Sequence, residues 1–554
     1  MDKMKKIVSI VALIAVAMSV MGVPARQGGM VRTAADGTQK LVFLHGNEHF
    51  HYMTDEEGNW LDEQTLAPLS EEARAAMEEA GVARQIRRAK EQKLGVGDEP
   101  NPAPRGLLIL VNFQDSKFVT PNDTIDAMLN GDHFTRSYKY DYEYVSPTTS
   151  QHTMIHYDGS SEGSVRQYFH DQSYGQYNPQ FDVVGPVTVS YNTAYYGANT
   201  SSDGGTDKNP VAMISEACKL ADQNGVDFSQ YDNDNDGYVD FVYVIYAGFG
   251  EADGGPAETI WPHQWDLSAY HYQYDNKYIG RYACGSELSF WSKLYAGIGT
   301  FCHEFSHVLG LPDIYETNSQ LTGIHTSGDW DLMDYGPYNN DGNTPPSYTA
   351  YERFYMGWLT PRLLKDPEYV TLHPINEGDG ESLLISTANT HNMSGWNPNP
   401  TEFYLLEAHN QDGWDTYLAG EGMLITRIRY NSSTWHSNAV NTNYRALGID
   451  ILEAKENTAK TKRGAATDAY PAGATEWTDY EDHEVTNIIR DAQTGVIQFS
   501  YRGADVPTGI ENVQWDNEQR TKVTKVIRDG QLYLLYKGTM YNVQGKKIYE
   551  DYQL

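Results

Sequence analysis

Two histidines and a glutamate lie within five residues of each other and could together hold and use a zinc ion. Residues 303–307 read His-Glu-Phe-Ser-His, and residues four apart lie on one face of a helix. His303 and His307 can therefore direct both imidazoles at one metal, with Glu304 beside them as a general base. The spacing predicts a catalytic zinc site. The alternative is a helix whose histidines only pack or face solvent.

A third ligand is expected shortly after this helix. Gly310 can adopt the positive φ that ends a helix, and the turn would bring Asp313 back to the metal as an oxygen ligand. Three protein ligands leave one position open, where water becomes a nucleophile at neutral pH. Asp329, Asp331 and Asp334 are the nearest alternatives for the third ligand.

The sequence around this helix resembles the immune inhibitor A family of secreted zinc endopeptidases, which belongs with the metzincin-like peptidases. The similarity also covers residues 106–113, 231–240, 260–263 and 330–336, with a fainter echo in 402–407 and 413–415. This resemblance implies a zincin-like catalytic domain in which His303, His307 and Asp313 bind zinc and Glu304 is the catalytic base.

Two further residues acquire a role only through this resemblance. Metzincin-like enzymes place a methionine in a tight turn beneath the zinc as a hydrophobic floor, and Met333 matches it. Tyr335 matches a tyrosine that some metzincins hold near the metal, where a phenol can hydrogen-bond the tetrahedral oxyanion. The alternative is that both are ordinary core residues.

Alternating acidic residues around a glycine predict a calcium site. The ligands expected are the carboxylates of Asp232, Asp234, Asp236 and Asp240 and the backbone carbonyl of Tyr238. The loop imitates the first part of an EF-hand, but Tyr243 stands where that motif requires a glutamate. Asp, Asn and Gly also form ordinary turns, which is the alternative.

The chain of 554 residues has a formal net charge of −34. Nucleic acid and anionic membranes are therefore poor partners, and the three cysteines are too few for a disulfide scaffold. Cys302, next to His303, is expected to be buried rather than a ligand.

Changes in pattern along the chain predict five segments. They are a signal peptide at 1–25, a propeptide at 26–105, the catalytic domain at 106–365, a β-sandwich at 366–503 and a C-terminal tail at 504–554. The end of the tail resembles the sorting segments of the type IX export route in Gram-negative bacteria. No segment outside the signal is long and apolar enough to predict a membrane span.

The expected fold is α+β, with a mixed sheet backed by helices in the catalytic domain. Apolar runs predict buried strands at 107–113 and 241–247 and short strands after residue 367. Helices are expected near 70–93, 165–169, 210–224 and 296–309. A hairpin is expected at 40–58 with a turn at residues 57–58, and its histidines, His45, His49 and His51, are expected to be exposed.

These observations predict a secreted or cell-surface zinc endopeptidase that acts on proteins or peptides, without membrane insertion and with calcium as a second ion. Two other classes stay open. One is a noncatalytic, adhesive calcium-binding protein on a peptidase scaffold, although such a protein would have no use for Glu304. The other is a zinc amidase that acts on the cell wall. Oligomeric state cannot be read from the sequence.

Overall fold

The computed structural model describes most of the chain from Gly22 onward. The described residues are 22–34, 36–47, 50–63, 65–77, 103–145, 152–199, 206–317, 326–456, 464–480, 482–506, 524–528, 531–536, 539–542 and 546–549. The apolar part of the expected signal, His49 and residues 78–102 of the expected propeptide lie outside these residues. Of the helix expected at 70–93, residues 71–77 are described and are helical.

A five-stranded mixed sheet lies at the centre of residues 106–365, which are here called the catalytic region after the domain expected there. Its order is β11-β14-β10-β5-β8, in which β11 is the one antiparallel strand. The strands are β5 (Arg105–Asn112), β8 (Gln180–Thr188), β10 (Val242–Phe249), β11 (His263–Asp266) and β14 (Arg281–Leu288). The strands expected at 107–113 and 241–247 are β5 and β10, so both predictions are confirmed.

Helices cover both faces of this sheet, which explains why its strands are continuously apolar. On one face Leu108 and Leu110 share a core with α6, and on the other Leu107 and Ile109 share a core with α5. The α-helices are α2 (Asn122–Asn130), α3 (Val165–Gln172), α4 (Thr193–Tyr196), α5 (Pro210–Gln223), α6 (Gly299–Val308), α7 (Ala350–Tyr355) and α8 (Ser432–His436). The 3-10 turns are η1 (Phe228–Tyr231), η2 (Ser268–Tyr270), η3 (Gly328–Trp330), η4 (Gly336–Gly342), η5 (Gly413–Tyr417) and η6 (Ala466–Asp468). The helices expected at 165–169, 210–224 and 296–309 correspond to α3, α5 and α6.

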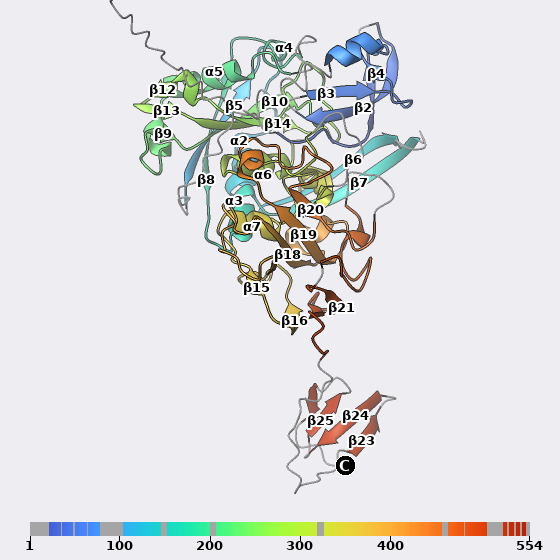
Figure 1. Cartoon of the computed structure of the whole chain (residues 1–554). Coiled ribbons are helices and arrows are strands. Elements are labelled where there is room, and N and C mark those ends of the chain that lie inside the picture. Colours follow the sequence, from blue (N-terminus) through green and yellow to red (C-terminus); the bar gives the residue numbers. More distant parts are fainter. Residues whose placement is uncertain are drawn as a thin grey trace, which may run out of the picture.

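The N-terminal unit, residues 22–77, forms one sheet together with a hairpin of the catalytic region (Figure 1). The sheet order is β4-β3-β2-β1-β6-β7, so the hairpin of β6 and β7 continues the sheet formed by β1 to β4. The strands are β1 (Gly29–Thr33), β2 (Gln39–Asn47), β3 (Phe50–Thr54), β4 (Trp60–Leu61), β6 (Thr135–Val145) and β7 (His152–Glu162). The hairpin expected at 40–58 is confirmed as β2 and β3, but the expected turn at 57–58 lies between β3 and β4.

Beyond residue 361 the chain forms two sheets that share one hydrophobic core. One has the order β15-β17-β18-β19-β20 and the other β16-β22-β21. Their strands are β15 (Arg362–Leu364), β16 (Glu368–Leu372), β17 (Leu383–Ser386), β18 (Glu402–His409), β19 (Gly422–Arg429), β20 (Ile449–Ile451), β21 (Val485–Arg490) and β22 (Ile497–Tyr501). The short strands expected after residue 367 are present, and the β-sandwich stays a prediction.

Two small sheets complete the described structure. β9 (Tyr238–Val239), β12 (Gln273–Tyr274) and β13 (Lys277–Ile279) form a three-stranded sheet next to the predicted calcium loop. The tail forms a four-stranded sheet of β23 (Thr524–Arg528), β24 (Gln531–Tyr536), β25 (Thr539–Asn542) and β26 (Lys547–Tyr549). The mixed α+β class is confirmed. Within the described residues, no helix has the length and apolar character to cross a bilayer.

Candidate metal centre

Three side chains converge at the C-terminal end of α6. The Nε2 atoms of His303 and His307 lie 3.0 Å apart, and Asp313 Oδ1 lies 3.3 Å from the first and 3.2 Å from the second. All three side chains are fully buried. Two imidazole nitrogens and a carboxylate oxygen at this spacing form one face of a coordination shell for a divalent ion such as zinc.

Backbone carbonyls orient both imidazoles. His303 Nδ1 lies 2.8 Å from the carbonyl oxygen of Leu332, and His307 Nδ1 lies 2.8 Å from that of Leu311. Each Nδ1–H can thus donate to a carbonyl, which leaves each Nε2 lone pair directed at the other two groups. Burial, together with His307, lowers the pKa of His303, and the neutral imidazole is the form that binds a metal.

Asp313 is held by a residue from a distant segment. Its backbone N–H donates to Asn438 Oδ1 at 2.6 Å, and its Oδ2 accepts a hydrogen bond from Asn438 Nδ2. Burial alone would raise the pKa of Asp313, but His307 and His303 outweigh burial and hold it well below its usual range. The carboxylate is therefore ionised, with Oδ1 facing the two histidines.

Two glycines allow this arrangement. Gly310 has φ of +106°, so the chain turns back after α6 and returns Asp313 to the histidines. At the start of α6, a Cβ on Gly299 would lie 2.0 Å from the carbonyl oxygen of Pro337. The helix can therefore pack closely against η4, the segment that follows the turn of Met333.

A stretch of the chain's own backbone lies across this centre. The N–H of Val23 donates to Glu304 Oε1 at 3.0 Å, and the carbonyl oxygen of Val23 accepts from Trp261 Nε1 at 2.9 Å. The carbonyls of Gly22 and Pro24 accept from Tyr315 Oη and Tyr338 Oη at 2.8 and 2.6 Å. Glu304 is buried in this arrangement.

Arg26 anchors the end of this stretch. Its guanidinium lies 2.7 Å from Asp253 Oδ1 and also pairs with Asp341. Residues 22–26 are here called the cleft segment. All of them except Ala25 make polar contacts with the catalytic region, and the N–H of Ala25 donates to the carbonyl oxygen of Gly46 in β2 at 2.8 Å. Residues 22–25 were assigned to the signal, whose cleavage site stays a prediction.

Met333 and Tyr335 lie in the turn that supports the histidines. Met333 is fully buried, its N–H donates to Asp331 Oδ1 at 2.7 Å, and the neighbouring Leu332 supplies the carbonyl to His303. Tyr335 is also buried and lines a pocket together with Arg26 of the cleft segment. The turn that contains Met333 thus contacts His303 through Leu332, while the roles of Met333 and Tyr335 stay predictions.

Comparison with known proteins gives a consistent result. Residues 98–359 match the family model "Immune inhibitor A peptidase M6, catalytic domain". Residues 98–359 are therefore similar to the catalytic domain of the immune inhibitor A peptidases. "Immune inhibitor A" of Bacillus thuringiensis subsp. alesti is 29% identical over 220 residues, which cover 35% of this chain and 32% of that protein. "Pre-pro-metalloprotease PrtV" of Vibrio cholerae serotype O1 is 26% identical over 292 residues, which cover 46% of this chain and 31% of the relative. The chain thus spans about a third of the length of the curated relatives it matches.

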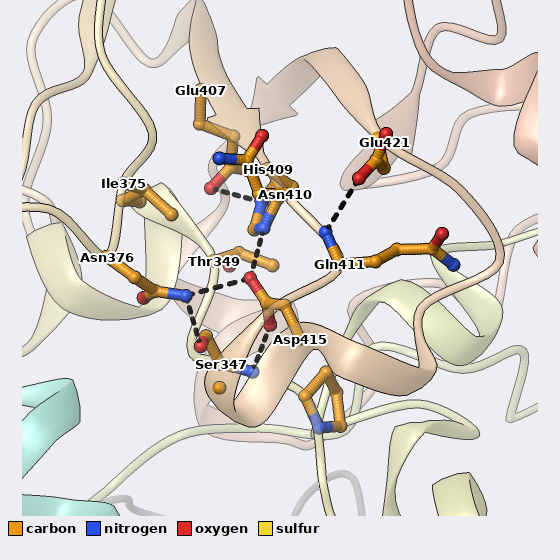
Figure 2. Close-up of polar contacts among 12 residues, drawn as sticks. Ser347, Thr349, Ile375, Asn376, Glu407, His409, Asn410, Gln411, Asp415 and Glu421 are labelled. Carbon is orange, nitrogen blue, oxygen red and sulfur yellow. Dashed lines mark hydrogen bonds and ion pairs between the residues drawn. The ribbon is translucent and has the colours of Figure 1, made fainter. Parts of the chain in front are cut away.

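The fainter motifs at 402–407 and 413–415 hold the region matched by the family model against the C-terminal sheets (Figure 2). His409 lies between two carboxylates, with Nδ1 2.8 Å from Asp415 Oδ2 and Nε2 3.3 Å from Glu407 Oε2. Asp415 Oδ1 also accepts the N–H of Ser347 at 2.8 Å. Glu407 Oε2 accepts the N–H of Ala350, the first residue of α7, at 2.6 Å. Burial opposes charge on His409, but Asp415 and Glu407 raise its pKa to about 10.

The predicted calcium loop is only partly assembled as expected. Carboxylate oxygens of Asp232, Asp234 and Asp240 lie within 4.8 Å of one another. Asp236 is not in this group, and its Oδ1 accepts the N–H of Tyr238 at 2.7 Å. The ammonium of Lys277 pairs with Asp232. Calcium at this loop therefore stays a prediction.

Several contacts of the peptidase centre were not predicted. The cleft segment escaped notice because Val23-Pro24-Ala25 has the small residues of a signal cleavage site. Asn438 carries no local signal, since it meets Asp313 across 125 residues of chain. The three cysteines, including Cys302, are buried and free, as expected for Cys302. His51 is buried, so the expected exposure of the hairpin histidines is wrong at that position.

Proposed function

We propose that the protein is a secreted, zinc-dependent endopeptidase that hydrolyses peptide bonds of protein substrates with Glu304 as general base. The observation that carries the proposal is the convergence of His303 and His307 Nε2 and Asp313 Oδ1 within 3.3 Å of one another. Two lone pairs and a carboxylate repel one another unless a cation lies between them. Two imidazole nitrogens and one carboxylate oxygen, with backbone carbonyls that orient the imidazoles, fit zinc.

Zinc bound by these residues would polarise the scissile carbonyl and lower the pKa of the attacking water. Glu304 follows His303 on α6, and its Oε1 already accepts an N–H from the cleft segment. With that segment gone, the Glu304 carboxylate would take the proton of the attacking water and return it to the leaving amine. Tyr335 would donate a hydrogen bond to the oxyanion.

The cleft segment supports a polypeptide substrate. Its backbone groups, rather than its side chains, are bonded to Glu304, Trp261, Tyr315 and Tyr338. Contacts of this kind suit an extended peptide of varied sequence, since they read the main chain. A zinc amidase of the cell wall or a purely adhesive protein has no need for them.

A substrate panel tests this function. Casein, a set of fluorogenic peptides and purified peptidoglycan would be incubated with the matured protein before chelation, after chelation and after zinc is restored. We expect cleavage of protein and internal peptide bonds that chelation abolishes and zinc restores. Cleavage confined to peptidoglycan would support an amidase, and no cleavage of any substrate would support the adhesive alternative.

We further propose that residues 26–105 act as a propeptide and that the cleft segment blocks the centre until it is removed. The support is the buried cluster in which Val23, Met30 and Leu44 pack with Ala252 and Trp261 of the catalytic region. An N-terminal unit docked in this way would keep the peptidase inactive before export. Export itself, including the type IX route, stays an expectation from the sequence.

N-terminal sequencing of the active form tests the propeptide. Because exposed linkers are cut most readily, we expect a start between about residues 96 and 107, within the usual uncertainty of such boundaries. Full activity in a form that still begins near Arg26 would contradict the propeptide. Full activity in a form that begins near Gly22 would show that the contact between Val23 and Glu304 has no inhibitory effect.

A further inference from the structure

A second cluster of metal-ligating groups lies between the N-terminal unit and the catalytic region. His51 on β3 and Glu63 after β4 meet Glu251, and one ligand atom of each lies within 4.8 Å of the others. His51 Nε2 is 3.3 Å from Glu251 Oε1. His51 Nδ1 lies 3.2 Å from the carbonyl oxygen of Asn47, so its N–H can donate there and leave Nε2 for a ligand, as at the catalytic histidines.

The amide of Asn199 reaches into the same cluster. Its Nδ2 lies 2.8 Å from Glu251 Oε1, 3.1 Å from Glu63 Oε2 and 3.1 Å from His51 Nε2. An amide nitrogen has two hydrogens and cannot satisfy three acceptors, while Asn199 Oδ1 is buried without a hydrogen-bond partner. Rotation of the amide by 180° places Oδ1 in the cluster as a fourth oxygen or nitrogen donor.

Buried carboxylate oxygens in the cluster have no hydrogen-bond partner. Glu251 is only 1% exposed, and its Oε2 is without a partner, as are Glu63 Oε1 and Asp207 Oδ1. Asp207 is close enough to Glu251 for the two carboxylates to repel each other. Arg32 approaches from the N-terminal unit, but three carboxylates exceed its single charge. Either a bound cation or a proton on His51 can balance this buried negative charge.

We propose that His51, Glu63, Asn199 and Glu251 bind a divalent transition-metal ion, with zinc the best match, that joins the N-terminal unit to the catalytic region. An imidazole nitrogen with carboxylate and amide oxygens suits zinc, whereas calcium takes oxygen ligands. Trp261 stacks on the His51 ring with centroids 4.6 Å apart and covers this side of the cluster. Two ligands come from each structural unit, so removal of residues 26–105 destroys the site.

The consequence for maturation rests on the proposed function, because only that proposal makes residues 26–105 a propeptide. The number of zinc ions bound per chain does not depend on the proposed function. An ion shared by the two units adds binding free energy to their contact and holds the cleft segment against Glu304. Loss of the ion is then expected to loosen the N-terminal unit before any bond is cut.

The test is zinc stoichiometry in the uncleaved chain carrying Glu304→Gln, which prevents self-cleavage. Zinc alone is the probe, with excess calcium present to occupy the loop at 232–240, and bound zinc is counted by plasma mass spectrometry. We expect two zinc ions per chain. His51→Ala and Glu63→Gln should each leave about one, and His303→Ala should also leave about one, lost from the other centre.

His45→Ala is the matched control, since His45 lies on the same hairpin but bonds Thr54 Oγ1 at 2.9 Å; it should keep both ions. Glu63→Gln changes a single atom, and its circular dichroism and melting curve exclude misfolding as the cause of a lower count. An unchanged count in both His51→Ala and Glu63→Gln overturns the proposal and assigns the charge balance to a proton on His51. A failure at the catalytic centre would instead appear as an unchanged count in His303→Ala.

Discussion

The candidate metal centre of His303, His307 and Asp313 is here called the catalytic centre after its proposed function. This centre and the cluster at His51 have similar donor atoms but are assembled in different ways. His303, His307 and Asp313 come from eleven consecutive positions, joined by one helix and one glycine turn. The groups around His51 come from four separate segments. Asn199, for example, is 148 residues away from His51 in the sequence. The first site follows from local geometry, whereas the second exists only when two structural units are docked.

This difference has a thermodynamic consequence. A helix holds His303 and His307 together before any ion binds, so that centre needs only the return of Asp313. At His51 each ligand depends on the docking of β2, β3 and β4 against the catalytic region. We therefore expect the catalytic ion to persist when the N-terminal unit is lost, and the second ion to leave with it.

The largest effect is expected from Asp313→Ala, which breaks the local site at its third ligand. Two imidazoles alone hold zinc weakly, so both zinc content at this centre and peptidase activity should be lost. Metal analysis and a peptide assay on the same preparation measure this. Asn438→Ala, which removes only the support of Asp313, should weaken zinc binding by about tenfold to a hundredfold. Full occupancy in Asp313→Ala would show that Asp329, Asp331 or Asp334 supplies the oxygen.

A smaller effect is expected at His409, which resembles the His51 cluster in joining distant segments and lies between the carboxylates of Asp415 and Glu407. His409→Gln leaves Asp415 and Glu407 facing each other in the interior, a loss of about 3–5 kcal/mol in the free energy of unfolding. The folded-state pKa of His409, about 10, lies above the ordinary histidine pKa of 6.5. The stabilisation is therefore complete below pH 6.5 and lost as pH rises through about 10.

Denaturant unfolding between pH 6 and 10 measures this difference between wild type and variant. The control is His373→Gln in the same unit, since His373 lies 3.9 Å from Glu377 in an exposed pair that should contribute at most about 1 kcal/mol. A difference between wild type and His409→Gln that stays constant over this range would show that His409 is not charged in the folded protein.

The smallest effect is expected at the loop of Asp232, Asp234 and Asp240. Like the catalytic centre, this site was predicted from the spacing of residues along the chain. Calcium at a hundredfold excess over its Kd should stabilise the fold by about 3 kcal/mol. Asp234→Asn should reduce the rise in melting temperature, and Lys277→Gln should increase it because the Lys277 ammonium competes for Asp232. If calcium moves no melting curve, the loop is an ordinary turn closed by Lys277.

Much of the fold near the catalytic centre was predictable because its signals are local. The apolar runs of β5 and β10, the strand β17 and the helices α5 and α6 all have the period and composition of their type. The hairpin of β6 and β7 was missed, although the alternation of tyrosine with charged residues in β6 is itself typical of a strand with one aromatic face. β6 pairs with β1 of the N-terminal unit, and no pattern within residues 135–162 indicates this pairing.

The same limit applies to the sites. His303, Glu304, His307 and Asp313 could be named in advance, since helix periodicity and one turn determine their meeting. Asp236 does not join the group of Asp232, Asp234 and Asp240, because its Oδ1 accepts the N–H of Tyr238 in the turn that forms, and its role as a calcium ligand stays a prediction. His51 was expected to be exposed because strand alternation within a hairpin cannot indicate that a second unit covers it.

The central claim is that Glu304 acts as the base beside a metal held by His303, His307 and Asp313. The most direct measurement is kcat of Glu304→Gln together with zinc content, both in matured protein without residues 26–105. We predict that zinc at this centre is retained and that kcat falls by about a hundredfold to ten-thousandfold, the usual contribution of general acid–base catalysis. Wild-type kcat in this variant, with zinc bound, would contradict the account.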